Sequence, residues 1–448
     1  MIFDMLKEHQ AKEKASFHMP GHKNARGFSG TFLADNPFAY DTTELCGTDA
    51  LIQPTGAILE AEQMAASIYG AAHSFFLVNG STVGILAMIY AAFCPGDVVL
   101  VDRYCHQSVL HACELAGVQP VYLTPSGSQV AGIPGTLSQD AVAQGFAQFP
   151  EAKGLIITSP NYYGKVADLA AISQLVHHHG GVLLVDEAHG AHFPFSDRFP
   201  KTAMEQGADL SVTSLHKSLN APNQTALLHI GTGFQAEELR RVLRMFQTSS
   251  PSYVLLAAME RALCEGKEQG ADKTEQLIQL IEPLGCPSLG DPFKLLPSWQ
   301  AQGLSGHEAD AIFREKFGIY AELATEHGLL LMCSWHNTKE DFALLHEAIR
   351  YCDGLPKKDS VRDIDPQLVF KPVMARCALS ELRQKESQHV SLERAEGRIC
   401  AGVVTAFPPC IPILLPGEIV TAEQIATIKR LHREGATITG MESGIKVI

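Results

Sequence analysis

Hydrophobic and polar positions alternate regularly along the middle of the chain. From about Ile58 to Leu228, helical stretches alternate with short runs of β-branched and aliphatic residues. This alternation is typical of an α/β fold in which a mostly parallel sheet is covered by helices. Seven runs are the predicted strands: Ser74–Val78, Val98–Val101, Val118–Leu123, Leu155–Thr158, Val182–Val185, Leu210–Thr213 and Ala226–Ile230. Ligands of open α/β sheets bind beyond the carboxyl ends of the strands, so we expect the chemistry to lie just after these runs.

The rest of the chain follows a different pattern. Residues 1–54 form an N-terminal arm, which is polar and punctuated by proline and glycine from His18 to Pro54, and we expect little regular structure there. Residues 55–288 are the expected large domain. From about Leu289 the pattern is mixed α+β, which predicts a smaller C-terminal region of one or more domains over residues 289–448.

Composition narrows the class of protein. Of the 448 residues, 46% are apolar and 19% are charged, which indicates a well-buried globular enzyme and excludes a disordered chain. The net charge is −14 with scattered acids, so neither nucleic acid nor a membrane surface is an expected partner. The eleven cysteines contain no C-x-x-C pair, and the start of the chain lacks the apolar run of a secretory signal. We therefore expect a cytoplasmic protein.

Two strand ends carry the residues that a pyridoxal-phosphate (PLP) enzyme needs. Asp186 follows Val182–Val185, where a half-buried carboxylate could pair with the pyridine nitrogen of PLP; an ordinary strand-end acid is the alternative. Lys217 follows Leu210–Thr213, where partial desolvation would lower its pKa as a Schiff base requires. A solvated loop lysine is the alternative there. Ser214 and His216 beside it could hold the cofactor phosphate.

Two further strand ends fit the same pocket. Asn79-Gly80-Ser81-Thr82 precedes an apolar helix, so its amides and hydroxyls could bind phosphate, although an ordinary helix cap would look the same. His106 follows another strand, and its flat ring could stack on the pyridine ring, although a lone histidine is usually structural. The joint occurrence of these motifs, more than any one of them, favours PLP chemistry.

Metal sites are the weaker interpretation of the histidines. Asp186-x-x-His189-x-x-His192 and His177-His178-His179 contain suitable ligand types. The triple histidine precedes Gly180-Gly181 and is better explained as the polar end of a helix that meets its glycine cap. We therefore expect no metal.

Taken together, these segments resemble the Orn/Lys/Arg decarboxylases of fold type I, the group that includes bacterial lysine, ornithine and biodegradative arginine decarboxylases. The matching motifs are Phe17-His18-Met19-Pro20-Gly21-His22-Lys23, Thr43-Glu44-Leu45, Val78-Asn79-Gly80-Ser81-Thr82, Asp186-Glu187-Ala188-His189-Gly190-Ala191-His192, Ser214-Leu215-His216-Lys217, Thr248-Ser249-Ser250-Pro251-Ser252-Tyr253, Pro408-Pro409 and Pro416-Gly417-Glu418. The resemblance spans nearly the whole chain.

The resemblance implies an aspartate aminotransferase-like large domain, a cofactor and a set of site residues. It implies a Schiff base between PLP and Lys217, with Asp186 at the pyridine nitrogen, His106 stacked on the ring and His189 as a further catalytic and cofactor contact. The implied phosphate contacts are Ser81, Thr82, Ser214 and His216, with Ser249 or Ser250 from a second subunit. A homodimer with shared active sites is therefore the expected minimum unit, and assembly beyond it stays open.

The implied reaction is decarboxylation of lysine, arginine or ornithine, each of which fits the motifs. The arm with His22 and Glu44 is expected to line the substrate entrance. The candidates for binding the distal substrate charge are Asp41, Glu44, Asp49 and Glu322. Rival functions are an aminotransferase or another lyase on the same fold, and a catalytically silent paralogue that regulates a partner decarboxylase.

The chain also departs from the family pattern. Arg103-Tyr104-Cys105-His106-Gln107-Ser108 stands where members often have Arg-Asn-x-His-Lys-Ser, and Phe407-Pro408-Pro409-Cys410 replaces Tyr-Pro-Pro-Gly. Neither change touches the expected cofactor anchors, but the second puts inherited substrate preference in doubt. The amino-terminal wing domain of larger relatives is not expected here, which groups the chain with the short forms.

Overall fold

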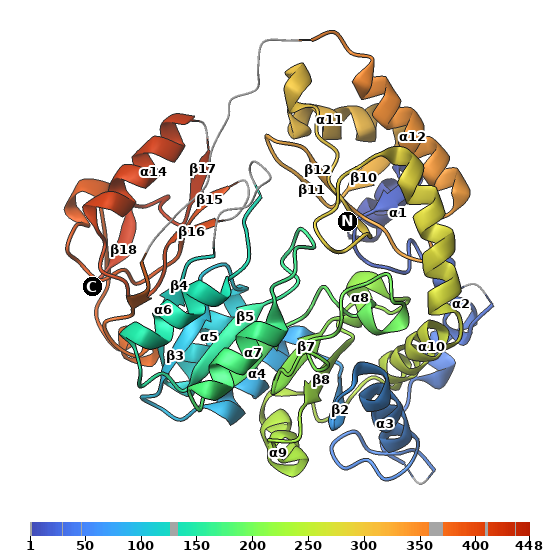
Figure 1. Cartoon of the computed structure of the whole chain (residues 1–448). Helices are drawn as coiled ribbons and strands as arrows, with labels where there is room; N and C mark the ends of the chain where they lie inside the picture. Colours follow the sequence, from blue (N-terminus) through green and yellow to red (C-terminus); the bar gives the residue numbers. More distant parts are fainter. Residues whose placement is uncertain are drawn as a thin grey trace.

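The computed structural model describes residues 2–28, 30–45, 47–125, 133–357, 371–407, 411–434 and 436–448. At its centre is an eight-stranded sheet with the order β13-β4-β3-β5-β6-β7-β8-β2 (Figure 1). The strands are β2 (His73–Leu77), β3 (Val98–Asp102), β4 (Gln119–Leu123), β5 (Gly154–Thr158), β6 (Val182–Asp186), β7 (Leu210–Thr213), β8 (Ala226–Ile230) and β13 (Val373–Met374). The block from β4 to β7 is parallel, β8 is antiparallel to both of its neighbours, and β13 is antiparallel to β4.

The α/β prediction is confirmed, and all seven predicted strands are present to within one residue at each end. The predicted strand number is one too low. The additional strand, β13, is two residues long and joins the edge of the sheet from a point some 250 residues beyond β4 in the chain (Val373 pairs with Tyr122). So short a strand has no alternation of apolar and polar residues that could reveal it in advance.

Helices cover both faces because successive strand residues point to opposite sides. Val99 and Val101 of β3 pack in the core under α4 (Ser81–Ala92), α5 (Gln107–Ala116) and α9 (Ala236–Phe246). Leu100 between them packs in the opposite core, under α6 (Gln139–Gln148) and α7 (Leu169–His178). The carboxyl ends of the strands stay open to the loops that carry the predicted site.

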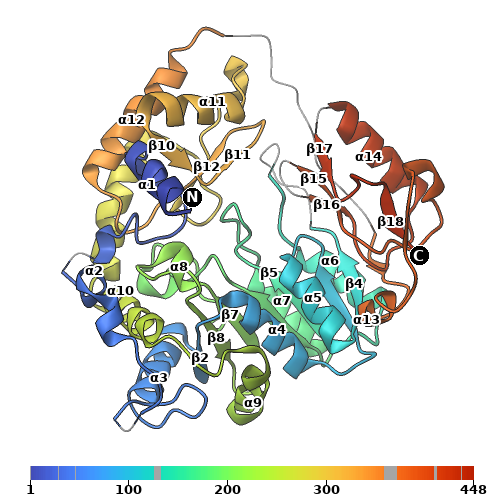
Figure 2. The same cartoon turned by 180° about the vertical axis from the view of Figure 1, so that it is seen from behind.

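A third core joins the large domain to the start of the chain. It includes residues of α3 (Ala57–Tyr69) and of the long helix α10 (Tyr253–Ile281), and β1 (Ala15–Phe17) pairs in parallel with β10 (Ile319–Ala321). The other elements of this unit are α1 (Ile2–Lys12), β9 (Lys294–Leu295), α11 (Gly306–Ile312), the π-helix η6 (Phe313–Phe317), β11 (Leu323–Ala324), β12 (Leu329–Met332) and α12 (Lys339–Asp353). Figures 1 and 2 both show α8 (Leu215–Ser218) beneath this unit.

Between His18 and Pro54 the described arm holds only short helices, as predicted: η1 (Arg26–Phe28), α2 (Phe32–Asp35) and η2 (Pro37–Tyr40). The arm lies against α8, because the Gly21 amide donates to the His216 carbonyl at 2.9 Å. The other short helices of the described chain are η3 (Phe193–Phe195), η4 (Glu282–Leu284), η5 (Gln300–Gln302), α13 (Leu379–Leu382) and η7 (Leu392–Arg394).

The end of the chain forms a separate unit with its own core. It contains β14 (Gln388–Val390), β15 (Val404–Phe407), β16 (Ile411–Leu414), α14 (Ala422–Glu434), β17 (Thr437–Thr439) and β18 (Ile445–Val447). Figure 2 shows it on the opposite side of the molecule from α11 and α12, so residues 289–448 hold two separate units. The exact boundaries at residues 54 and 288 stay a prediction.

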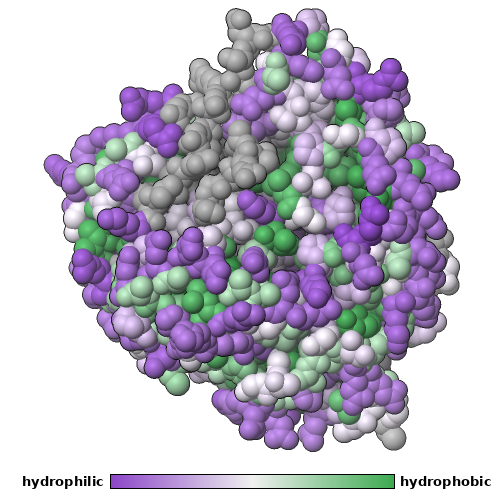
Figure 3. Space-filling model, in the orientation of Figure 1, coloured by the Kyte–Doolittle hydropathy of each residue, from purple (hydrophilic) through white to green (hydrophobic). Residues whose placement is uncertain are grey.

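One face of the molecule shows how polar and apolar residues are distributed over its surface. Hydrophilic residues dominate the rim of the space-filling view, and apolar residues gather towards the middle of that face (Figure 3). Among the described residues, every helix is either too short or too polar to cross a bilayer.

Candidate active site

The predicted cofactor lysine lies in a chain of three side chains. Lys217, in α8 directly after β7, is partly buried, and its Nζ lies 3.0 Å from Nε2 of His189 in the loop after β6. The other ring nitrogen of His189, Nδ1, lies 2.9 Å from Nζ of Lys294. Lys294 also donates to the carbonyl of Tyr162 at 2.9 Å. A second lysine, which the sequence interpretation missed, is therefore linked to Lys217 through one imidazole.

Burial controls the charge of these groups. It lowers the pKa of Lys217, while the carboxylates of Asp186 and Glu322 act in the opposite direction. Burial also lowers the pKa of Lys294 to about 8 and holds the pKa of His189 well below its usual range. His189 is thus an uncharged imidazole between two amines at neutral pH. The direction of the pKa shift at Lys217 is the one that a Schiff-base lysine requires.

Asp186 lies where the ends of three strands meet. It is 3% exposed, and its Oδ1 accepts a hydrogen bond from the Ala188 amide at 3.1 Å. Asp102 at the end of β3 is close enough to interact with its charge, and burial raises the pKa of Asp102 to about 7. Thr158 is the register partner of Asp186 in β5, and its buried Oγ1 has no hydrogen-bond partner in the described part of the chain. Within this group the carboxylate of Asp186 could pair with a protonated ring nitrogen, because a nearby negative charge favours the charged form.

The predicted phosphate residues surround a common loop. The Gly80 amide, which precedes Ser81 and Thr82 at the start of α4, donates to the Gln224 carbonyl at 2.8 Å. Thr225 follows Gln224 in this loop, and its carbonyl lies 3.2 Å from Nδ1 of His216. Ser214 is fully buried, and its Oγ lacks a partner among the described residues. An unpaired buried hydroxyl is costly, so this one fits a site that accepts a polar ligand such as phosphate.

His106, the residue predicted to stack on the ring, is the N-cap of α5. Its Nδ1 lies 2.7 Å from Oγ of Ser108 and accepts the Ser108 amide at 3.2 Å. The ring reaches solvent, but the surrounding protein still lowers its pKa by desolvation, which Asp186 opposes and Lys217 reinforces. His106 therefore lies near Asp186 and Lys217, the two expected cofactor anchors. The cap uses Nδ1 of its ring and does not involve Nε2.

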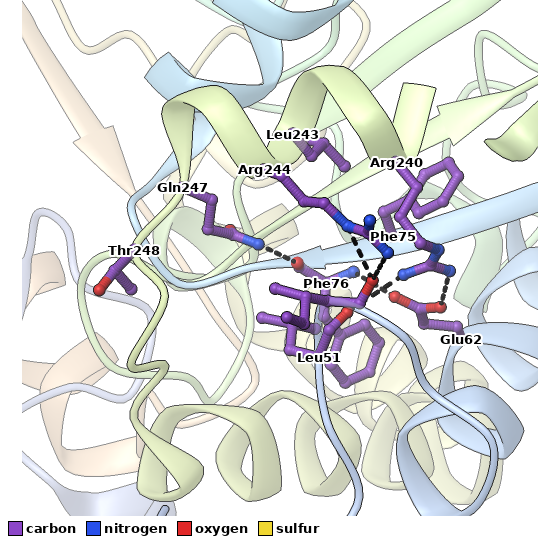
Figure 4. Close-up of a pocket in the computed structure, with 10 residues that line it drawn as sticks. Leu51, Glu62, Phe75, Phe76, Arg240, Leu243, Arg244, Gln247 and Thr248 are labelled. Atoms are coloured by element: carbon purple, nitrogen blue, oxygen red, sulfur yellow. Dashed lines mark hydrogen bonds and ion pairs between the residues drawn. The ribbon is translucent and has the colours of Figure 1, made fainter. Parts of the chain in front are cut away.

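A small pocket shown in Figure 4 lies apart from this cluster, between the arm, β2 and α9. Its volume of about 10 Å³ has room for a single water molecule. Arg240 crosses it to pair with Glu62 at 2.7 Å and to donate to the Leu51 carbonyl at 3.2 Å. Gln247 accepts the Val78 amide at 3.0 Å. These side chains fasten the arm and the edge strand, and they leave no space for a cofactor.

Ser249 and Ser250 follow this pocket and are exposed. The preceding residue, Thr248, donates its amide to Oδ1 of Asn79 at 3.0 Å, which ties the segment to the loop before Ser81. No contact recorded for the described residues joins Ser249 or Ser250 to the cluster around Lys217. Their role in the site of a second subunit stays a prediction.

Of the acidic candidates, Glu322 is the one that lies at the cluster. It influences the charge of Lys217 and Lys294, accepts the Met19 amide at 2.9 Å and accepts the hydroxyl of Tyr162. Asp49 accepts four backbone amides, those of Ala50, Thr55, Gly56 and Ile58, each at 2.9 Å, and so stabilises the start of α3. It has no lone pairs left for a substrate.

Asp41 and Glu44 are exposed on the arm. His22, in the same arm, interacts electrostatically with His216, and partial burial lowers the pKa of His22 to about 4. The arm thus reaches the site through His22, while Asp41 and Glu44 face solvent in this single chain. Of the motif Phe407-Pro408-Pro409-Cys410, the two matching prolines and the departure at Cys410 lie outside the described residues.

The histidines of the rejected metal motifs have other partners. Nε2 of buried His192 lies 3.1 Å from Oδ1 of Asp291, and His177 lies 2.8 Å from Asp209. His179 follows the end of α7 just before Gly180, whose φ is 70°, as predicted for a glycine cap. Elsewhere in the described chain, His9, Glu13 and His18 form a group of possible ligands. His18 and Glu13 are 2.7 Å apart and form an ion pair there.

Comparison with known proteins agrees with this geometry. Residues 1–284 match the major domain of the Orn/Lys/Arg decarboxylases, and residues 358–445 match their C-terminal domain. The chain belongs to the Orn/Lys/Arg decarboxylase family. An uncharacterized protein of Bacillus subtilis is 35% identical over 96% of this chain and 94% of its own length. The arginine decarboxylase of Bacillus anthracis is 32% identical over 98% of this chain and 94% of its own length.

The solved structure of lysine decarboxylase A from Pseudomonas aeruginosa shares the fold, with a TM-score of 0.75 at 20% identity. The match covers all of this chain and 79% of that one. The predicted fold class and the family resemblance are thereby confirmed. Membership of this decarboxylase family makes the chain a PLP-type amino-acid decarboxylase in class, and PLP is the cofactor that the family implies.

Sequence reasoning missed three members of the site: Lys294, Tyr162 and Asp102. Lys294 lies in Gly290-Asp291-Pro292-Phe293-Lys294, a segment that the pattern marked only as a domain start. Asp102 directly follows a predicted strand, which is the same signal that singled out Asp186. Attention to every acid at a strand end would have found Asp102, whereas nothing local distinguishes Lys294.

Proposed function

We propose that this enzyme decarboxylates a basic L-amino acid, with Lys217 as the residue that binds PLP covalently. The main support is the position of the partly buried Lys217 amine. It lies 3.0 Å from the uncharged imidazole of His189 and interacts electrostatically with Asp186. Asp186 would hold the ring nitrogen, His106 would cover the ring, and Ser81, Thr82, Ser214 and His216 would hold the phosphate. When bound, PLP supplies an electron sink for the pair left behind as carbon dioxide departs.

The residues of this chain would then orient the substrate and move protons. Lys217 would act as acid and base towards the substrate, with His189 Nε2 3.0 Å from its Nζ. Asp186 and Asp102 are both buried, so their carboxyl groups would shield the ring side of the proposed site from water. Orientation of the alpha carboxylate selects decarboxylation over amino transfer on this fold.

For the substrate we rank arginine first, with lysine and ornithine as alternatives. Support comes from the relative named arginine decarboxylase, which matches at 32% identity over nearly the full length of both chains. A lysine decarboxylase of Pseudomonas aeruginosa matches at 28% identity and over 74% of its own length. Glu322 is the acid that we assign to the distal guanidinium or ammonium, because it lies at the cluster and a carboxylate pairs well with either cation.

We further propose a cytoplasmic homodimer with shared active sites. Support comes from the exposed Ser249 and Ser250 and from exposed apolar side chains on the arm, among them Phe38 at 83% and Leu45 at 60%. Apolar groups of this size exposed on an arm are typical of an interface.

The deciding experiment combines trapping with assay. Borohydride reduction in the presence of PLP, followed by peptide mass spectrometry, should label Lys217 and leave the Lys217→Arg variant unlabelled at that position. Carbon dioxide release should be measured from arginine, lysine and ornithine separately. Labelling of another residue, or amino transfer to a keto acid with no carbon dioxide from any of the three, would overturn the proposal.

A further inference from the structure

The contacts around His189 restrict how many protons the site can hold. A lysine ammonium only donates hydrogen bonds, whereas a neutral imidazole has one donor nitrogen and one acceptor nitrogen. His189 faces one lysine with each nitrogen, Lys217 at 3.0 Å and Lys294 at 2.9 Å. If both lysines were ammonium groups, one N–H would point at another. At least one of the two amines must therefore be the free base.

Burial makes this restriction strong. His189 is 6% exposed and Lys294 is 2% exposed, so bulk water cannot relieve a mismatch between donors. An imidazolium would be worse still, because it has two donors and would require both lysines to be neutral. The structure thus favours a neutral His189 with a single ammonium shared between the two lysines.

We propose that Lys294 and Lys217 share one proton through His189, so that Lys294 is a positioning residue that keeps Lys217 available as a free amine. A proton that leaves Nζ of Lys217 adds to Nε2 of His189 while the Nδ1 proton passes to Nζ of Lys294. No bond other than N–H changes, and the imidazole is neutral before and after. This inference deepens the proposed function, since it rests on Lys217 as the lysine that captures PLP.

Charged and titratable groups on the neighbouring elements influence which of the two lysines, Lys217 or Lys294, is protonated. Asp291 favours the ammonium at Lys294, whereas Asp186 favours it at Lys217, and Glu322 favours it at both. Three imidazoles also interact electrostatically with Lys217 or His189: His106, His192 and His216. Because each lysine has a carboxylate nearby that favours its ammonium form, the proton is not confined to one of them. Sharing of the proton requires this balance.

The test measures the reactivity of Lys217 without any cofactor. The full chain, freed of PLP, is labelled briefly with trace acetic anhydride between pH 6 and 11, and the Lys217 and Lys294 peptides are quantified by mass spectrometry. In the unmodified chain the reactivity of each lysine should rise in two steps, because interacting sites titrate jointly. A single step with an ordinary lysine midpoint at Lys217 would overturn the inference without the need for any variant.

Two variants make the prediction directional. Lys294→Met removes the competing cation, so labelling of Lys217 at pH 7.5 should fall about tenfold, which corresponds to a rise of one unit in its pKa. Lys294→Arg carries a permanent charge, so labelling of Lys217 should stay as fast as in the unmodified chain or become faster. A purely structural role for Lys294 would make the two variants behave alike, and that result would contradict the inference.

Lys23 provides the matched control. It is also 2% exposed, but its Nζ donates to the backbone carbonyls of His18 at 2.7 Å and Met332 at 2.9 Å. Lys23→Met should therefore leave the labelling profile of Lys217 unchanged even if it lowers the melting temperature. Because labelling involves no PLP, its outcome is independent of borohydride trapping, and failure of the proposed function can be told apart from failure of proton sharing.

Discussion

At the scale of residues, the ends of β3 and β6 bring two buried carboxyl groups, Asp102 and Asp186, into electrostatic reach of each other. Both are 3% exposed. Asp102 accepts the amides of Tyr104 at 2.9 Å and Thr158 at 3.4 Å, yet burial outweighs these bonds and raises its pKa to about 7. Below about pH 7 the protein therefore carries a protonated acid close to its expected cofactor anchor.

This raised pKa predicts how stability depends on pH. In the unfolded chain an aspartate titrates near pH 3.9, so between about pH 4 and 7 the folded state binds the extra proton. The stabilisation is fully present below about pH 4 and is lost as the pH rises to 7, at up to about 1.4 kcal/mol per unit. Urea unfolding of the cofactor-free protein from pH 5 to 8 should show this slope.

Asp102→Asn should flatten that slope, whereas Asp272→Asn, at an exposed position of α10, should keep it. An equal slope in the Asp102→Asn variant and the unmodified chain would show that Asp102 is not the responsible group.

At the scale of elements, the arm is positioned by its close approach to α8. A Cβ added at Gly21 would lie 2.6 Å from both the Leu219 carbonyl oxygen and the Ser218 carbonyl carbon, which no backbone tolerates without movement. Position 21 therefore requires a glycine, because a side chain there would clash with the backbone at the end of α8. Because His22 follows it and Lys217 lies in α8, a displaced arm would move both sides of the proposed substrate entrance.

Gly21→Ala should lower kcat/KM for decarboxylation by about ten- to hundredfold, since displacements of about 1 Å cost this much in positioned reactions. Steady-state carbon dioxide release measures the effect, and circular dichroism checks the fold. Gly233→Ala is the matched control, because its added Cβ would meet nothing closer than 4.0 Å. Equal kcat/KM in the two variants would argue against the role of the arm.

A second element-scale contact joins the end of β3 to the C-terminal unit. Arg103 and Glu418 are both fully buried and form an ion pair, and Arg103 also donates to the carbonyls of Pro412 and Ile413 at 3.3 Å. Glu418 of the Pro416-Gly417-Glu418 motif thus provides the carboxylate that pairs with Arg103. Loss of one partner would leave a buried charge unpaired.

Glu418→Gln should lower the free energy of unfolding by about 3 kcal/mol, measured by urea denaturation. Glu393→Gln removes an acid of the same unit whose pairing with Lys429, at 3.0 Å, is exposed to solvent. That variant should unfold at nearly the same urea concentration as the unmodified chain. Similar losses in the two variants would mean that burial of the Arg103 pair is not what stabilises this junction.

At the scale of the whole molecule, apolar side chains are exposed along the arm and beside the end of α9. They are Phe38, Tyr40, Leu45, Ile52 and Met245. The exposed Ser249 and Ser250 follow Met245 closely in the chain. A second copy that covers this surface would bury the apolar groups and receive the two serines, as the proposed dimer requires.

Phe38→Asp should therefore weaken the dimer and reduce decarboxylation together, because each site would lose the partner's contribution. Sedimentation velocity at several protein concentrations measures the first effect and carbon dioxide release the second. Leu115→Asp, at a 52% exposed position on α5, should change neither. A fully active monomer of the unmodified chain would contradict the shared-site proposal.

The sequence by itself determined what depends on neighbours in the chain. Seven strands were predicted to within one residue because buried strands leave a continuous apolar run bounded by polar turns. Lys217 and Asp186 were selected as candidates for the same reason: each directly follows such a run, and parallel strands bring their carboxyl ends to one edge.

Only the tertiary structure decided which distant groups meet. Lys294 reaches His189 across 105 positions of sequence, and Arg103 reaches Glu418 across 315. Asp49 looked like a substrate residue until its oxygens proved to be used by backbone amides. Such pairings depend on how separate units dock, and docking leaves no periodic signal in the local sequence, so the proton partner of Lys217 was visible only in the folded chain.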